Sequence, residues 1–100
     1  MIKHIVMWKL KDEAHGNPRA VNISLIREKL EALVGVVPGL LKVEVGTDFS
    51  ATNVSADIVL YSEFSSREAL IAYQIHPAHE TAAAFIREAV TDRLMVDYEI

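Results

Sequence analysis

Residues 2–10 read Ile2-Lys3-His4-Ile5-Val6-Met7-Trp8-Lys9-Leu10, and this alternation is typical of a β-strand. One face of the strand presents Ile2, His4, Val6, Trp8 and Leu10, and the other presents Lys3, Ile5, Met7 and Lys9. Both faces are apolar in the middle, whereas a single layer of helices covers only one face of a sheet. The sequence therefore predicts helices on one side of this strand and a different cover on the other side.

An amphipathic helix follows a polar loop at residues 12–16. Asn17 is a good cap and Pro18 a good first helical residue, while Pro38-Gly39 ends the pattern. Its apolar residues recur at spacings of three and four and are Ile23, Ile26, Leu30, Leu33 and Val37. Because the opposite face carries charges of both signs, we expect this stripe to pack in the core and not against a membrane.

Two more strands and a broken helix come next. Residues 40–49 predict a strand with Leu41, Val43 and Val45 on one face, and residues 57–64 predict a third strand. A helix begins at Ser65-Ser66, a second begins at Pro77, and residues 94–100 form the last strand.

This order of elements predicts an α+β, ferredoxin-like βαββαβ fold, with a four-stranded antiparallel sheet and helices on one face. Ile5, Met7, Val59 and Tyr61 would lie on the bare face. The simplest cover is the same face of a second copy, so we expect a homodimer through the helix-free sheet face.

Composition restricts the partners of the chain. One hundred residues make a single domain, 1–100, and a hydrophobic content of 51% exceeds what a lone small domain can bury. A net charge of −4 argues against nucleic acid and anionic membranes as partners. No apolar run approaches the roughly 18 residues of a membrane span. The absence of cysteine leaves the redox compartment undetermined, so a cytoplasmic location is the default expectation, with small molecules or proteins as partners.

The break between the two predicted helices, Tyr73-Gln74-Ile75-His76-Pro77-Ala78-His79-Glu80, carries the candidate chemistry. His76 precedes Pro77 and should cap the second helix, which places His79 in its first turn. The positive end of the helix dipole disfavours the imidazolium, so His79 should be neutral and able to accept a proton beside Tyr73.

Several short motifs occur in order along the whole chain: Lys3-His4-Ile5-Val6, Val37-Pro38-Gly39, Ser62-Glu63-Phe64, His76-Pro77-Ala78-His79 and Val96-Asp97-Tyr98-Glu99. Together they resemble the stress-responsive A/B barrel (Dabb) family. The resemblance implies a dimeric α/β barrel in which two ferredoxin-like protomers pack sheet against sheet.

The resemblance extends to a plant member of that family, olivetolic acid cyclase, which closes a polyketide by aldol chemistry without a cofactor. Its catalytic residues match Tyr73 and His79, and a pocket histidine matches His4. A second pocket histidine of that enzyme, on the third strand, falls near Asp57 or Ile58, and neither is histidine.

Two classes of function stay open. In the first, the protein binds a small apolar or polyketide-like molecule between helices and sheet, with His79 as general base, Tyr73 as hydrogen-bond donor to an enolate oxygen, and no cofactor. The binding residues would be His4, Val6, Trp8, Phe64 and His76. In the second, it is a non-enzymatic, stress-associated structural or interaction protein, and the same residues serve the fold.

Three minor hypotheses concern single residues. Trp8 in the pocket would also suit a cofactor-independent monooxygenase-like member of the dimeric barrel superfamily. A metal site of His4, His76, His79 and Glu80 is disfavoured, because His76 lies at the cap and the sequence identifies no further carboxylate that would orient the ligands. We expect His15, in the polar loop, to be solvated.

Overall fold

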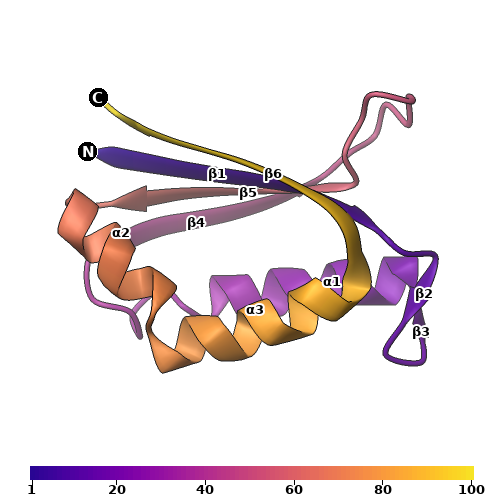
Figure 1. The fold of residues 1–100 in the computed structure, drawn as a ribbon, viewed down its shortest axis with the longest axis horizontal. Helices are drawn as coiled ribbons and strands as arrows, with labels where there is room; N and C mark the ends of the chain where they lie inside the picture. Colours follow the sequence, from indigo (N-terminus) through magenta and orange to yellow (C-terminus); the bar gives the residue numbers. More distant parts are fainter.

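The computed structural model describes residues 1–100 as an antiparallel four-stranded sheet, with helices packed on one of its faces. Figure 1 shows β1 (Ile2–Leu10), β4 (Leu40–Thr47), β5 (Ile58–Phe64) and β6 (Val90–Glu99) in the sheet, with β2 (Glu13–Ala14) and β3 (Asn17–Pro18) as a small separate hairpin. The helices are α1 (Arg19–Glu31), α2 (Arg67–Gln74) and α3 (Pro77–Ala89). The strand order β4-β5-β1-β6 confirms the predicted ferredoxin-like α+β fold.

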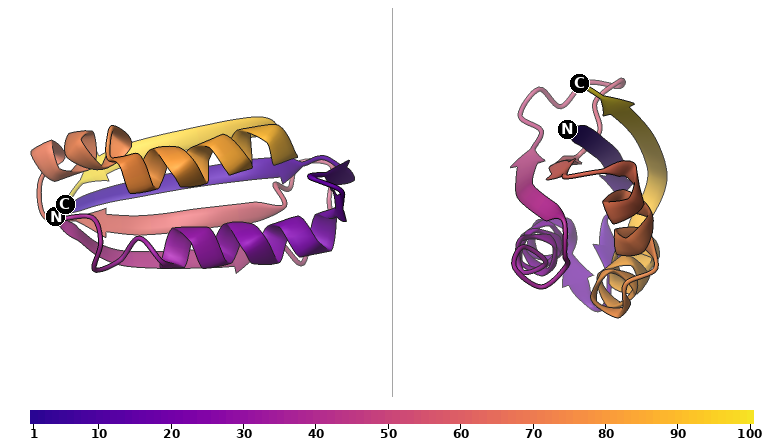
Figure 2. Two further views of the ribbon diagram at one scale, coloured as in Figure 1. Left: turned by 90° about the horizontal axis from the view of Figure 1, so that it is seen from below. Right: turned by 90° about the vertical axis from the view of Figure 1, so that its left-hand side faces the viewer.

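The helices and the sheet enclose one apolar core. Figure 2 shows α1 along the β4 side of the sheet and α3 along the β6 side, with β1 and β5 between them. The inward residues of β1 are all buried, from Ile2 to Leu10, and they meet the buried stripe Ile26, Leu30 and Leu33. No helix of the protein is long and apolar enough to span a bilayer.

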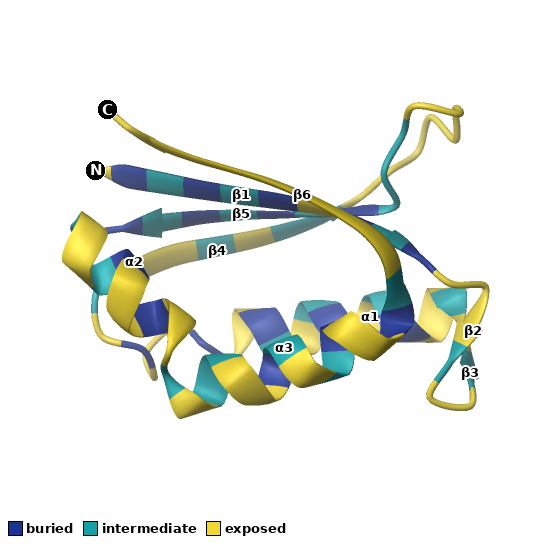
Figure 3. Ribbon diagram, in the orientation of Figure 1, coloured by how far each residue is buried: buried dark blue, intermediate teal, exposed yellow.

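The opposite face of the sheet carries no helix. Ile5, Val59 and Tyr61 are only half-buried there, and Met7 is exposed. Strand β6 is exposed along almost its whole length, as its yellow colour in Figure 3 shows. In the pairing of β6 with β1, Leu94 lies opposite Met7, Val96 opposite Ile5 and Tyr98 opposite Lys3. These three residues of β6 extend the same apolar face.

Residues 48–57, between β4 and β5, project from the sheet on the side away from the helices (Figure 1). This loop carries two large apolar side chains in water, Phe49 at 95% exposure and Val54 at 86%. Ala51 at its tip adopts a positive φ of 53°. A pocket between this loop and the helix-free face is lined by Met7, Val54 and Leu94, together with polar side chains.

The structure corrects the predicted start and end of the first helix. Asn17 does not cap it; Pro18 is the N-cap residue and makes no side-chain cap hydrogen bond. The Asn17 side chain instead donates to Asn22 Oδ1 at 3.3 Å, and Asn22 donates to the Ala14 carbonyl at 2.9 Å, which holds the hairpin that replaces the predicted loop. The α-helix ends at Glu31, and turns continue to Pro38, so Leu33 and Val37 are buried outside it.

Two strand predictions also change. The pairing with β5 shifts between Leu40 and Lys42, so that Leu40 takes the inward position and is buried, while Leu41 is 52% exposed. The prediction that Leu41 shares a face with Val43 was wrong, because an extra residue in one strand inverts the alternation before it. Strand β6 begins at Val90 and not at Leu94, directly after α3.

Gly39 forms the tight connection into β4. Its φ of +80° lies in the left-handed region, and a Cβ built there would lie 2.5 Å from the Cβ of Ala69. Both facts require glycine at this position, since α2 approaches the backbone too closely for a side chain.

Candidate functional site

A cavity of about 350 Å³ lies between the helices and the inner face of the sheet. Eight of its twelve lining residues are hydrophobic, and the lining as a whole consists of His4, Val6, Trp8, Leu30, Leu60, Tyr73, His79, Ala83, Ile86, Arg87, Val90 and Arg93. The volume lies at the lower end of the roughly 300–1,000 Å³ typical of small-molecule sites. The predicted residues His4, Val6, Trp8, Tyr73 and His79 therefore come together at one cavity.

The break between α2 and α3 places two of these residues. Helix α2 begins after Ser66, whose hydroxyl accepts a hydrogen bond from the Ala69 N–H at 3.1 Å. The predicted cap role of His76 is confirmed, because its Nδ1 accepts from the Ala78 N–H at 3.1 Å and Pro77 follows as the first helical residue. His76 does not line the cavity, so its predicted binding role is not supported by its position.

His79 is held in the first turn of α3 with one ring nitrogen free. Its Nδ1–H donates to the backbone carbonyl of Gln74 at 3.2 Å, which leaves Nε2 as the acceptor in the neutral ring. Burial of the half-exposed ring lowers the pKa of His79, and the Gln74 carbonyl opposes this only in part. The direction agrees with the prediction from the helix dipole, although the main cause is loss of hydration.

Tyr73 packs directly against this imidazole. Their ring centroids lie 4.2 Å apart, and Tyr73 also contacts Phe64 with centroids 4.9 Å apart. Tyr73 is only 2% exposed, and burial raises the pKa of its hydroxyl to about 12. The hydroxyl is therefore protonated at neutral pH, and no hydrogen bond within the protein engages it. Tyr73 lines the cavity, where this group can serve as a donor. Phe64 lies beneath Tyr73 and supports the ring without reaching the cavity.

His4 enters from β1 and is oriented by a carboxylate on β6. Its Nδ1–H donates to Asp97 Oδ1 at 2.5 Å, and its side chain is 4% exposed. The rings of His4 and Tyr73 lie 6.1 Å apart at an angle of 69°. With Nδ1 occupied, the His4 Nε2 is left as an acceptor in the neutral ring. The buried Ser62 hydroxyl donates to the His4 carbonyl at 3.0 Å and fixes the backbone there.

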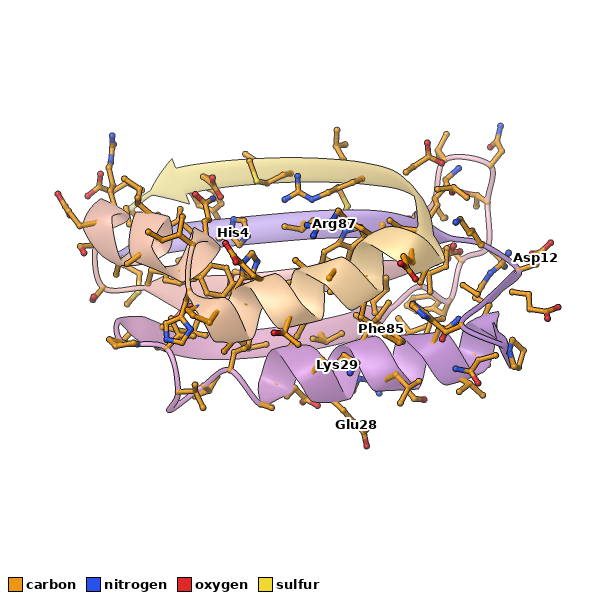
Figure 4. All side chains as sticks on the ribbon, turned by 60° about the horizontal axis from the view of Figure 1, so that its bottom comes forward. His4, Asp12, Glu28, Lys29, Phe85 and Arg87 are labelled. Atoms are coloured by element: carbon orange, nitrogen blue, oxygen red, sulfur yellow. The ribbon has the colours of Figure 1, made fainter.

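Sequence reasoning missed Asp97 and two arginines. Asp97 and Arg93 stand opposite His4 and Trp8 in the pairing of β6 with β1, so their side chains share the inner face of the sheet. Arg87 lies in the last turn of α3. Figure 4 shows Arg87 between α3 and β1, on the same side of the molecule as His4. The alternation of residues along β6 could have indicated that Arg93 and Asp97 share one face. Placing that face against His4 and Trp8 required the register between β1 and β6.

The remaining candidates lie elsewhere. The alternative metal set is not assembled, because no group of three or more histidine, cysteine or acidic side chains comes together in the chain. His15 is an exposed residue, as predicted, but its side chain is only 20% exposed. Its ring stacks on Phe85 with centroids 3.9 Å apart, and its Nε2–H donates to the Phe85 carbonyl at 2.9 Å. Figure 4 shows Phe85 close to Lys29, whose ammonium lies 4.7 Å from the ring centre.

Comparisons with known proteins agree with this architecture. The profile of the family described as the stress responsive A/B barrel domain matches residues 2–100. An uncharacterised protein of Streptomyces coelicolor is 31% identical over 99 residues, which is 99% of each chain. These matches confirm the resemblance drawn from the motifs.

Two solved structures show how widely the fold is shared. A dimeric protein of unknown function with a ferredoxin-like fold from Bacteroides fragilis is 33% identical, with a TM-score of 0.86, over 99% of this chain and 95% of that one. Hydroxynitrile lyase from Passiflora edulis is 18% identical, with a TM-score of 0.84, over 99% and 92% of the two chains. At that identity the second likeness concerns the fold alone.

Proposed function

Because the chain belongs to the stress responsive A/B barrel domain family, we propose that its cavity binds a small apolar or polyketide-like molecule and catalyses proton transfer on it without a cofactor. One observation carries this proposal. A neutral imidazole acceptor, His79 Nε2, and a protonated donor, the Tyr73 hydroxyl, sit side by side at an apolar cavity with no hydrogen-bond partner inside the protein. Unpaired polar groups in such a place are suited to a ligand.

The chemistry that fits this pair is enolisation of a carbonyl compound. His79 Nε2 would take the proton from the carbon next to the carbonyl, and the C–H electron pair would become the enolate. The Tyr73 hydroxyl would donate a hydrogen bond to the enolate oxygen, where the negative charge develops. His4, fixed by Asp97, would orient the substrate through Nε2. The enolate carbon could then attack a second carbonyl of the same molecule, with the proton returned to the new alkoxide by the imidazolium.

Hydrogen–deuterium exchange tests this step without knowledge of the natural substrate. We would follow by NMR the loss of the acidic protons of a small aryl 1,3-diketone, benzoylacetone, in D₂O. General-base catalysis contributes roughly 10²–10⁴-fold, so Tyr73→Phe and His79→Ala should each lose most of the protein-dependent rate. His15→Gln is the control, because it removes a histidine outside the cavity and should leave the rate unchanged.

The outcomes separate the function classes. If His79→Ala exchanges as fast as the wild type, proton transfer at this site is refuted. If the wild type does not accelerate exchange and both variants change only the melting temperature, the residues serve the fold and the non-enzymatic class holds. Consumption of dioxygen with the diketone would instead favour the monooxygenase-like alternative, which would start from the same carbanion.

We also propose that two copies pair through their helix-free sheet faces. Leu94 and Val96 of β6 join Ile5 and Met7 on one apolar surface. The loop that carries Phe49 projects beside this surface and could pack against a second copy. At one end of the face Lys3 donates to the Tyr61 hydroxyl and to Glu63, at 2.5 Å and 2.9 Å, so that the polar groups there are already paired. Burying the face therefore leaves few unpaired polar groups.

Val96→Asp tests this interface, and Val36→Asp is a matched control. The two valines have similar exposure, 50% and 55%, but Val36 lies in the turns after α1. In sedimentation velocity we expect Val96→Asp to shift the protein to monomer, because a two-fold contact would bury the new charge twice. Val36→Asp should sediment as the wild type does. A Val96→Asp protein that stays fully dimeric would contradict this interface.

A further inference from the structure

Two arginines from different elements line the same cavity. Arg87 extends from the last turn of α3, and Arg93 lies on the inner face of β6, opposite Trp8. Both line the cavity that holds Tyr73 and His79. The twelve lining residues include these two guanidinium groups and two histidines, but no lysine and no carboxylate.

Neither arginine is neutralised by the protein. Arg19 pairs with Asp12, and Arg67 pairs with Glu99 at 2.9 Å, whereas no carboxylate lies within 4.0 Å of Arg87 or Arg93. The contact that Arg93 does make is to the sulfur of Met95 at 3.6 Å. The chain has 14 acidic and 10 basic residues, so carboxylates are plentiful. Two unpaired guanidinium groups at a cavity are therefore available to an anion from outside.

The positive charge of Arg93 affects the pKa of two residues of the cavity. Burial is the main influence on the pKa of both Tyr73 and His79. The positive charge of Arg93 also lowers the pKa of each, although at His79 its effect is smaller than the rise caused by the Gln74 carbonyl and by Glu80. The carboxylate of Asp97 is engaged by His4. The positive charge of Arg93 therefore reaches both candidate catalytic groups of the cavity.

We infer that the ligand is a small acid, with one carboxylate held by Arg87 and Arg93 and an apolar body against Trp8, Leu60 and Ile86. This inference rests on the proposed function, because it assigns the substrate class of the same site. Arginine presents a planar fork of donors that matches a carboxylate in a bidentate contact. The bound carboxylate orients the molecule, so that the carbonyl to be enolised lies toward Tyr73 and His79. A small keto acid has this arrangement of groups.

A matched pair of probes tests the charge requirement. Trp8 is the only tryptophan of the chain and lines the cavity, so its fluorescence reports on occupancy. We would titrate the protein with 3-phenylpropanoate and with its neutral isostere 3-phenylpropanamide at neutral pH and low salt. Hydrogen bonds to charged groups are worth more than neutral ones, and we expect the carboxylate to bind about tenfold more tightly.

Single-charge variants locate the effect. Arg93→Gln and Arg87→Gln should each weaken 3-phenylpropanoate binding by about tenfold and leave 3-phenylpropanamide unchanged. Arg27→Gln is the control for the lost positive charge, because Arg27 hydrogen-bonds to Thr47 away from the cavity. Both cavity arginines are exposed, so their replacement should not unfold the protein. Arg93→Lys should restore only part of the affinity, because it keeps the charge but loses the fork.

The results of these titrations separate the carboxylate requirement from the proposed ligand binding and proton transfer on which it rests. Equal affinity for acid and amide, unaffected by Arg87→Gln and Arg93→Gln, would overturn the anion requirement while leaving the cavity as a ligand site. A carboxylate preference that Arg27→Gln abolishes as well would also overturn it, since net charge would then explain the effect. If neither probe changes the Trp8 fluorescence and the wild type does not accelerate deuterium exchange of benzoylacetone, both proposals fail.

Discussion

Replacing Tyr73 by phenylalanine is the most informative single change, because it removes one oxygen and leaves the ring contacts in place. The ring packs against His79 and Phe64 at centroid distances of 4.2 Å and 4.9 Å, and Tyr73→Phe keeps both. The hydroxyl has no hydrogen-bond partner in the protein. The change should therefore reveal what the oxygen does for a ligand, separately from what the ring does for the core.

The expected stability change is small. An ordinary intramolecular hydrogen bond contributes about 1 kcal/mol, and no such bond is lost here. Removal of a hydroxyl from a buried site also relieves part of its desolvation cost, so stability should stay within about 0.5 kcal/mol of the wild type or rise. Tyr73→Ala, by contrast, deletes the ring and should cost about 3–5 kcal/mol, as large-to-small core changes do.

Thermal unfolding at one fixed protein concentration measures the difference, since the apparent stability of a dimer depends on concentration. For a domain of this size about 1 kcal/mol corresponds to roughly 4–8 °C, so Tyr73→Phe should move the Tm by less than about 4 °C. The same sample should lose most of its deuterium-exchange activity. A fall in Tm of more than about 8 °C would refute the reasoning, because the hydroxyl would then be held by a structural hydrogen bond.

Three further predictions concern other parts of the protein. Burial lowers the pKa of His79 from its usual 6.5, so the unfolded chain binds this proton more readily than the folded protein. The contribution of His79 to folding stability should therefore be complete above pH 6.5 and fall as pH decreases. A pH series of unfolding midpoints should show this loss in the wild type but not in His79→Gln. The exchange rate should likewise have its acid limb below pH 6.5, and a limb above 6.5 would contradict the assignment of the base. Asp97→Asn should slow exchange roughly tenfold to hundredfold by loosening His4, with a similar Tm, and an unchanged rate would remove His4 from the site. Gly39→Ala should cost about 1–3 kcal/mol in urea unfolding, because the φ of +80° and the 2.5 Å approach to the Ala69 Cβ both exclude a side chain, and a variant as stable as the wild type would contradict this account.

Local patterns were sufficient for much of the fold. The alternation of residues 2–10 predicted a two-faced strand, and Ser66, His76 and Pro77 marked the helix break at the correct residues. These features depend on neighbours within a few positions in the chain. Features that depend on register were missed, because the extra residue at Leu41 changes the alternation only through its pairing with β5.

The site divides in the same way. Tyr73 and His79 are six residues apart and lie on consecutive helices, so local reasoning could connect them. His4 and Asp97 are 93 residues apart, and only the pairing of β1 with β6 brings them together. Arg87 and Arg93 belong to no sequence motif. They can be recognised as residues of one cavity only when the positions of α3 and β6 are known. Sequence reasoning therefore identified Tyr73, His79 and His4 as candidate site residues, but not Asp97 and the two arginines.

The alternation of β6 makes this strand part of two surfaces. Arg93 and Asp97 point to the cavity side, while Leu94, Val96 and Tyr98 lie on the face assigned to the partner. Deleting one residue of β6 would exchange the two sets and so damage recognition and assembly together. A bound ligand that steadies β6 would also tighten the dimer, and by thermodynamic reciprocity dimer formation would tighten ligand binding to the same degree. Affinity per protomer should therefore increase with protein concentration, which would make the abundance of this protein in the cell a control on its own activity.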